Sequence, residues 1–310
     1  MQLGKELLPE HSFSEFRPSG AALQHSILFE LPLLFVTRRG FTCQFMKFWI
    51  PFLKPSPKVA VIRLQGVISA AGRGSLTDAS LAPVIERAFR RRRPAAVALL
   101  VNSPGGSPVQ SSLIAARIRR LAQEKNIPVY AFVEDVAASG GYWLATAAEE
   151  IWVDDSSIVG SIGVISAGFG LHEFISRHGI ERRLYTAGKS KSMLDPFQAE
   201  KPADVKRLKR LLEQIHSNFI TQVKERRGNA LADDPSLFTG EIWIGSSAID
   251  VGLADGVGHL VPRMKEVFGD KVRFLRYGPK STLLQRLAAK MLGGGLEYLE
   301  ERAEFARFGL

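Results

Sequence analysis

AAVALLV, residues 95–101, is followed directly by NSPGGS, residues 102–107. An unbroken apolar run of this length is typical of a parallel strand that is covered on both faces. The glycine-rich residues after it indicate a sharp turn, and residues 108–121 continue with the pattern of a helix. This strand–turn–helix unit predicts an α/β domain.

The same alternation of strands and helices recurs on both sides of this unit. Strands are expected at 59–68, 128–133, 150–153 and 183–186, an apolar segment at 158–166, and helices at 81–89, 138–148, 171–178 and 203–227. Thr77 and Asp78 are the expected caps of the first helix. Repeated strand–helix order predicts an α/β fold with a mainly parallel sheet.

Composition divides the chain into three regions. Residues 58–278 carry the α/β pattern, and residues 1–57 form an N-terminal extension and linker. This extension is expected to be membrane-associated, or to be untranslated before Met46 if that residue is the real start. Residues 279–310 form an amphipathic helical tail, whose polar face carries Arg286, Lys290, Arg302 and Arg307. Such a tail lies on a membrane or packs on a neighbouring subunit, and we expect it to pack.

The charge and cysteine content limit the partners and cofactors. The net charge is +10, but the densest basic run, 90–93, ends an expected helix, where cations are favoured by the helix dipole. No stacking-aromatic pattern accompanies it, so we expect no nucleic acid and consider a membrane surface the more plausible acidic partner. The apolar stretches 26–37 and 48–53 are shorter than the ~20 residues that a spanning helix needs. A single cysteine, Cys43, excludes an intramolecular disulfide, and we expect no metal or other cofactor.

A second glycine-rich junction, residues 137–143, contains Ser139 after another buried strand. Because ligands gather beyond the carboxyl ends of parallel strands, one junction could hold an oxyanion and the other a nucleophile. Taken alone, Ser139 is better explained as the N-cap of a helix. A nucleophilic serine also needs a base, and no histidine lies in a recognisable catalytic context. The six histidines, each expected at the surface, are His11, His25, His172, His178, His216 and His259.

The combination of motifs resembles the signal peptide peptidase A family, in its short, single-repeat form. The motifs, in the family's order, are Asn102–Gly106, Ala138–Tyr142, Gly160–Val164, Gly188–Lys191 with Pro196-Phe197, and Gly240–Gly245 with Ala248, Gly252-Leu253 and Asp255. The resemblance covers about 59–260. It implies a Clp-protease/crotonase-like fold and a serine endopeptidase that cleaves unfolded apolar peptides, such as cleaved signal peptides.

The resemblance also assigns the site residues. Ser139 matches the nucleophile and Lys191 the general base, with Lys189 as a nearby competitor. Ser161 matches a serine that orients the lysine, and the Gly105–Gly106 backbone matches the oxyanion loop. The expected substrate-groove candidates are Ser103, Gly140, Gly141 and Tyr142. A lysine must be neutral to accept a proton, and burial in an apolar pocket disfavours its charged form.

The resemblance further implies a homo-oligomer in which neighbouring subunits complete each active site. Because we find no convincing transmembrane helix, we expect a cytoplasmic protein or one at the periphery of a bacterial inner membrane. Two other functions stay open: a crotonase-type acyl-CoA hydratase or isomerase with Glu134 and Asp135 as its carboxylates, and an inactive membrane-associated scaffold. A Clp-type Ser-His-Asp peptidase is disfavoured, since no histidine lies between Ser139 and Gly170.

Overall fold

One eight-stranded sheet organises the described part of the chain. The structure is a computed structural model that describes residues 56–70, 75–188, 191–278 and 302–310. The expectations about the N-terminal extension, the start at Met46, Lys189 and most of the tail therefore lie outside the described residues.

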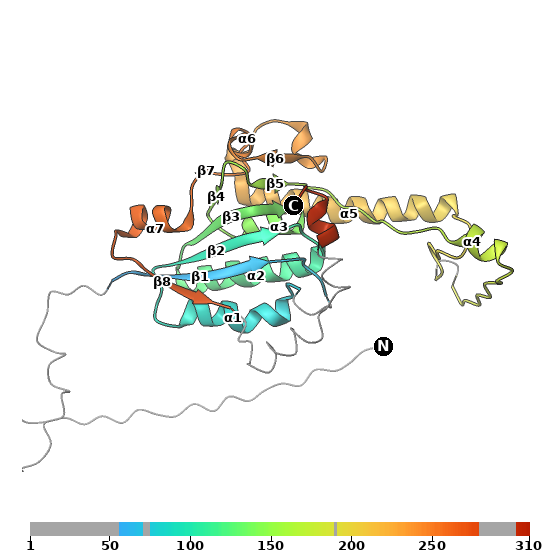
Figure 1. Ribbon diagram of the computed structural model, residues 1–310, viewed down its shortest axis with the longest axis horizontal. Helices are drawn as coiled ribbons and strands as arrows, with labels where there is room; N and C mark the ends of the chain where they lie inside the picture. Colours follow the sequence, from blue (N-terminus) through green and yellow to red (C-terminus); the bar gives the residue numbers. More distant parts are fainter. Residues whose placement is uncertain (1–55, 71–74, 189–190, 279–301) are drawn as a thin grey trace, which may run out of the picture. The chain divides into compact units, whose positions relative to one another are not determined.

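The sheet has the strand order β6-β5-β3-β2-β1-β8, and β4 pairs with both β3 and β7 (Figure 1). The strands are β1 (Lys58–Gln65), β2 (Ala96–Ser103), β3 (Val129–Ala138), β4 (Glu150–Val153), β5 (Ile158–Gly160), β6 (Ile242–Ile244), β7 (Gly256–Val257) and β8 (Arg273–Tyr277). Among the described residues, every pair of neighbouring strands is parallel except β5 with β6, which is antiparallel. The expected α/β fold with a mostly parallel sheet is confirmed.

Helices cover both faces of the sheet. They are α1 (Asp78–Arg90), α2 (Pro108–Lys125), α3 (Gly140–Ala145), α4 (His172–Arg177), α5 (Pro202–Arg227), α6 (Ser246–Asp250) and α7 (Leu260–Phe268). The larger core cluster lies between the sheet and helices α1, α2, α3 and α5. A smaller cluster on the opposite face includes Met264 of α7. This two-sided burial explains why β2 is apolar from Ala96 to Val101.

Local sequence sets the boundaries of α1. The Thr77 side chain accepts from the Ser80 amide in a capping box, so its predicted capping role is confirmed. Asp78 instead holds Arg117 of α2 through two contacts of 2.8 Å. The helix ends at Arg90, and Arg92 and Arg93 have φ angles of 63° and 46°, outside the helical region. The basic run is therefore a helix terminus, as predicted.

Three expected elements differ from the structure. Residues 183–186 form no strand, because they lie in an exposed segment with no neighbouring strand to pair with. The strand expected at 59–68 ends at Gln65, and Ile68 makes only isolated bridges. The helix expected at 138–148 is limited to Gly140–Ala145, since β3 continues through Ala138. No helix among the described residues has both the length and the apolar content to cross a bilayer.

Arg227 joins the end of α5 to the closing segment of the domain. Its guanidinium contacts both carboxylate oxygens of Asp255 at 2.9 Å and donates to the Gly252 carbonyl at 2.9 Å. The arginine side chain is 4% exposed. The Asp255 side chain is 30% exposed, so the arginine is the buried partner. Replacing Arg227 removes three hydrogen bonds made by a charged donor in the interior, which destabilises the fold.

We expect Arg227→Met to lower the free energy of unfolding by roughly 2 kcal/mol, measured by denaturant titration. The matched control is Arg120→Met, which breaks a half-exposed ion pair with Glu124 on α2. That control is expected to change stability by less than about 1 kcal/mol. Equal effects of the two substitutions would contradict the structural role of Arg227.

Candidate active site

Ser139 lies at the junction of β3 and α3 in a strained backbone conformation. Its φ and ψ are 50° and −121°, and the equivalent position before α6 has 51° and −118° but is filled by Gly245. A non-glycine residue in such a region costs about 1–3 kcal/mol and is typical of functional sites. Ser139 occupies the N-cap position, yet its side chain makes no capping hydrogen bond. Its hydroxyl is therefore available for another role.

The surrounding backbone holds Ser139 in this conformation. Its amide donates to the Gly160 carbonyl of β5 at 2.8 Å, and its carbonyl accepts from the Trp143 amide at 3.0 Å. Gly105 packs against it so closely that a Cβ on Gly105 would lie 2.8 Å from the Ser139 Cβ. The glycine at 105 is thus required by close approach to the serine.

A cavity of about 480 Å³ opens beside Ser139. Its lining combines both glycine-rich junctions with the exit of β5, with α5 and with the carboxyl end of the chain. The lining residues used below are Gly106, Ser139, Gly140, Trp143, Ser161, Phe219, Glu304, Arg307 and Phe308. Trp143 and Phe219 stack with ring centroids 5.0 Å apart and form an aromatic wall. Residues far apart in the chain thus meet around one serine.

Two residues that line this cavity have backbone N–H groups without a partner among the described residues. Neither the Gly106 nor the Gly140 amide donates to a protein acceptor there, and a Cβ on Gly140 would lie 3.4 Å from the Gly106 nitrogen. The Gly105 amide, by contrast, donates to Ser103 Oγ at 3.3 Å. Paired free donors beside a serine are suited to stabilise an oxyanion. The geometry thus favours Gly106 with Gly140 over Gly105 as donors.

Ser161 reaches the same cavity from the end of β5. It also has a positive φ, 50°, and its amide donates to the Glu241 carbonyl at 2.7 Å. Trp243 of β6 packs on Gly160, where an added Cβ would lie 2.7 Å from the indole ring. The antiparallel β5–β6 pair therefore positions the Ser161 backbone.

His216 differs from the expectation that all histidines lie at the surface. It is half-buried on α5, and its Nε2 lies 3.0 Å from the carbonyl oxygen of Ile162, the residue after Ser161. The contact joins α5 to the Ser161 loop. A single histidine in a 26-residue helix carries no motif signal, so only the tertiary structure reveals this link.

Three of the groove candidates are buried away from the cavity. Ser103 donates to the Gly66 carbonyl at 2.7 Å, and a Cβ on Gly141 would lie 2.3 Å from the Ser103 carbonyl oxygen. Tyr142 is fully buried and donates to the Leu253 carbonyl at 2.8 Å. Burial raises the pKa of Tyr142, which keeps it a neutral donor. The structure gives these residues packing contacts, and Gly140 alone of the four candidates lines the cavity.

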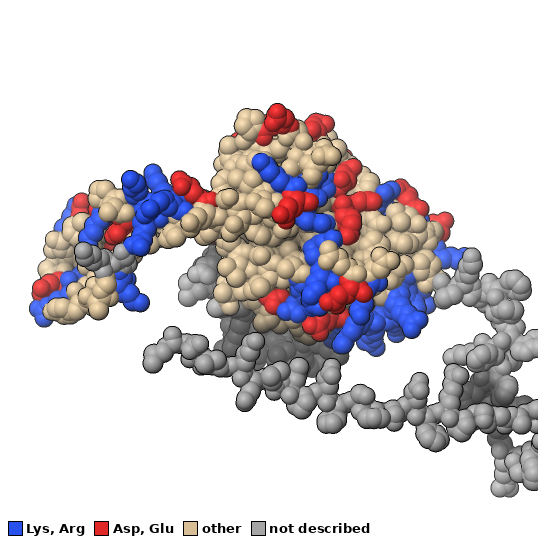
Figure 2. Space-filling view, turned by 180° about the vertical axis from the view of Figure 1, so that it is seen from behind, with Lys and Arg blue, Asp and Glu red and all other residues tan. Residues whose placement is uncertain are grey.

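Lys191 lies on a separate lobe, formed by residues 165–214 around α4 and the first half of α5. In Figure 1 this lobe extends away from the sheet, and Figure 2 shows many basic side chains on it. Lys191 is exposed and does not line the Ser139 cavity. The structure therefore brings Ser139, Ser161, Gly106 and Gly140 together, but not Lys191.

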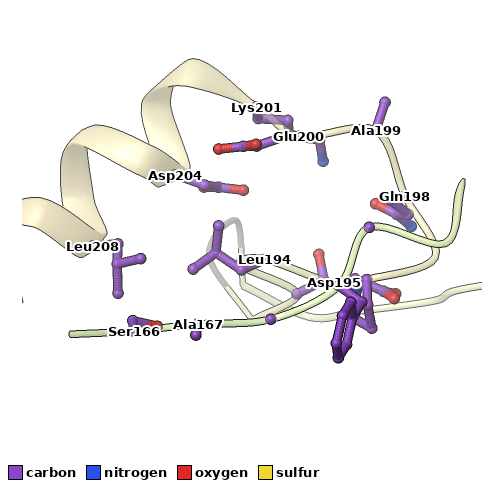
Figure 3. Close-up of a pocket in the computed structure, with 15 residues that line it drawn as sticks. Ser166, Ala167, Leu194, Asp195, Gln198, Ala199, Glu200, Lys201, Asp204 and Leu208 are labelled. Carbon is purple, nitrogen blue, oxygen red and sulfur yellow. The ribbon is translucent and has the colours of Figure 1, made fainter. Parts of the chain in front are cut away.

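A second cavity, of about 370 Å³, lies inside this lobe and under the Lys191 loop (Figure 3). Leu194 points into it from that loop, toward Leu208 of α5. The next residue, Asp195, accepts from the Phe197 amide at 3.0 Å and from Arg182 at 3.3 Å. This cavity shares none of its described lining residues with the Ser139 cavity. Among the described residues, no group of three or more His, Cys, Asp or Glu side chains is arranged to hold a metal ion.

Comparison with known proteins identifies the domain. Residues 121–267 match the model of peptidase family S49, and this stretch contains Ser139, Ser161 and Lys191. Residues 121–267 belong to peptidase family S49. The predicted family relationship is confirmed. Membership of family S49 supports the activity of a serine-type peptidase.

Three relatives of the S49 domain illustrate its range. A Brucella melitensis protein named Na⁺/H⁺ antiporter NhaA is 47% identical over 272 residues, covering 82% of this chain and 37% of that protein. The chloroplastic serine protease SPPA of Arabidopsis thaliana is 30% identical over 211 residues, covering 66% and 31%. An Enterococcus faecium protein assigned provisionally as signal peptide peptidase SppA is 26% identical over 208 residues, covering 65% and 60%. The chain thus spans about a third of the first two proteins.

Proposed function

We propose that this chain is a serine endopeptidase in which Ser139 is the nucleophile and Lys191 the general base. The observation that carries the proposal is the Ser139 cavity. In this cavity, Ser139 has a strained backbone and its side chain makes no capping hydrogen bond. It lies beside the backbone N–H groups of Gly106 and Gly140, which have no partner among the described residues. Membership of family S49 supports the same activity. We also propose that the α/β domain has the Clp-protease/crotonase-like topology.

In the proposed reaction, Ser139 Oγ attacks the carbonyl carbon of the scissile peptide bond. The neutral amine of Lys191 takes the hydroxyl proton, and the Gly106 and Gly140 amides stabilise the negative carbonyl oxygen. The intermediate collapses, the C–N bond breaks, and the lysine ammonium gives its proton to the leaving amine. A water molecule then attacks the acyl-enzyme with the amine again as base, which releases a carboxylate and restores Ser139.

We propose that a neighbouring copy of the chain supplies Lys191. Support comes from its exposed position on the lobe, outside the cavity that contains Ser139. The lobe also exposes large apolar side chains, which an interface between subunits would cover. They are Ile165, Phe169, Leu171, Phe174, Ile180, Tyr185, Leu194 and Leu211. In such a homo-oligomer, Ser161 of one subunit orients the amine of another.

The proposed substrates are unfolded, mainly apolar peptides such as cleaved signal peptides. The largely apolar and aromatic cavity walls, with Trp143 and Phe219, favour this class. We further propose peripheral contact with an anionic membrane surface, which the exposed basic residues at the start of α5 support. These are Lys201, Lys206, Arg207, Lys209 and Arg210.

A crotonase-type reaction is less well supported than peptide hydrolysis. It needs free carboxylates at the oxyanion site, but Glu134 pairs with Arg63 at 2.7 Å and Asp135 accepts a hydrogen bond from Asn102. Neither carboxylate lines the Ser139 cavity. Covalent labelling by a neutral fluorophosphonate separates the two functions. A peptidase is labelled at Ser139, whereas labelling that persists in Ser139→Ala would contradict the proposal.

Activity is expected to rise with pH, because only an unprotonated amine accepts the Ser139 proton. Below the ionisation of the base the rate should fall about tenfold per pH unit, since the neutral fraction does so. Initial rates on an uncharged peptide between pH 6 and 10 measure this dependence. We expect no effect of EDTA. Activity that is lost to EDTA and restored by zinc would contradict a Ser–Lys mechanism.

A further inference from the structure

The carboxyl end of the chain packs beside the nucleophile. Residues 302–306 are helical, and Phe305 and Phe308 pack against Val136, Ala138 and Ile158 of β3 and β5. Figure 1 shows this end of the chain, in dark red, near β5. The contact covers an apolar patch made by the end of β3, which leads into Ser139, and by the start of β5. The last residues of the tail therefore pack on the sheet of their own chain, whereas packing on a neighbouring subunit was expected.

The same segment supplies the charges of the Ser139 cavity. Glu304, Arg307 and Phe308 line it, and the other described residues that line it are apolar or uncharged polar. Arg307 donates to Glu304 at 2.9 Å, and the two side chains are 48% and 46% exposed. A peptide in this cavity therefore meets one positive and one negative group, which neutralise each other.

We propose that residues 302–310 form a wall of the substrate site and that the Glu304–Arg307 pair sets its charge preference. The proposal rests on the peptidase function assigned to Ser139. With the pair intact, a charged substrate side chain can bind Glu304 or Arg307 only by displacing the other member of the pair. The neutral pair thus favours uncharged, apolar substrate residues over both acidic and basic ones. Loss of either partner leaves a single charge that attracts the opposite one.

Three peptides test this proposal. They share one apolar sequence and carry Asp, Ala or Lys at a position close to the cleaved bond, and kcat/KM is measured for each with the full chain. Glu304→Ala is expected to raise the Asp-to-Lys ratio of kcat/KM roughly two- to fivefold, as for half-exposed charge pairs. Arg307→Ala is expected to lower that ratio by a similar factor. Because the ratio is taken within one variant, a loss of folded protein cancels.

Matched variants separate charge from packing. The double exchange Glu304→Arg with Arg307→Glu restores a neutral pair and is expected to return the ratio to that of the unsubstituted chain. Arg120→Ala and Glu124→Ala disrupt an ion pair of similar exposure on α2 and are expected to leave the ratio unchanged. At about 1 M salt, where the Debye length is roughly 3 Å, the shifts should shrink.

The outcomes distinguish this proposal from the function on which it rests. Opposite shifts in the two single variants, reversed by the double exchange, support the charge-selective wall. If cleavage depends on Ser139 but the Asp-to-Lys ratio of kcat/KM is the same in all variants, the charge-selective wall is contradicted and the peptidase function is retained. Shifts in the same direction also overturn it. Cleavage that persists in Ser139→Ala overturns both.

Discussion

Ser139→Ala and Lys191→Ala are each expected to lose peptidase activity by on the order of 10³-fold or more, and a mixture of the two should recover part of it. Each loss is large because a nucleophile without its base, or a base without its nucleophile, cannot complete the acyl transfer. Combining both substitutions in one chain should cost no more than either alone, since the pair acts as a unit.

Recovery in the mixture follows from sharing of the site between subunits. Where an intact Ser139 from one chain meets an intact Lys191 from a neighbour, a complete site forms. The measurement is hydrolysis of an apolar peptide after the two inactive chains are co-refolded, with light scattering to give the assembly mass. Lys189→Ala is the matched control and is expected to reduce peptidase activity only slightly. A fully active monomer would contradict the shared site, and loss of activity in Lys189→Ala alone would reassign the base.

Gly105→Ala is expected to lower kcat by roughly 10²-fold or more, because displacement of the nucleophile by about 1 Å has that effect. The added Cβ would lie 2.8 Å from the Ser139 Cβ and 2.9 Å from the Gly140 nitrogen. Gly105 also has a φ of 107°, which is strained for any other residue. The new methyl group therefore moves both the nucleophile and one proposed oxyanion donor.

Gly278→Ala is the matched control for this substitution. A Cβ there has no heavy atom within 4 Å, and Gly278 is not among the glycines with a positive φ. We expect it to retain activity and stability. Steady-state kinetics and thermal unfolding of both variants provide the comparison. Full activity in Gly105→Ala would show that the close contact with Ser139 does not position the nucleophile.

Local patterns predicted most of the strands and helices before Ser139. The apolar run at 95–101 became β2, and the spacing of apolar residues after Thr77 became α1. These predictions succeed because strand burial and helix capping depend on neighbouring residues in the chain. The prediction of a strand at 183–186 was wrong because strand formation also depends on residues that are distant in the chain. A strand needs a partner, and that segment has none beside it.

The sequence by itself determined the α/β class, the S49 motifs and the two glycine-rich junctions, because each depends on residue types at short spacings. Only the tertiary structure decided which groups share the Ser139 cavity. It placed the free amides of Gly106 and Gly140 together, set His216 against the Ile162 carbonyl, and brought Glu304 and Arg307 to the cavity wall. Contacts between such distant residues arise from the packing of helices and the chain end on the sheet, and no local pattern encodes them.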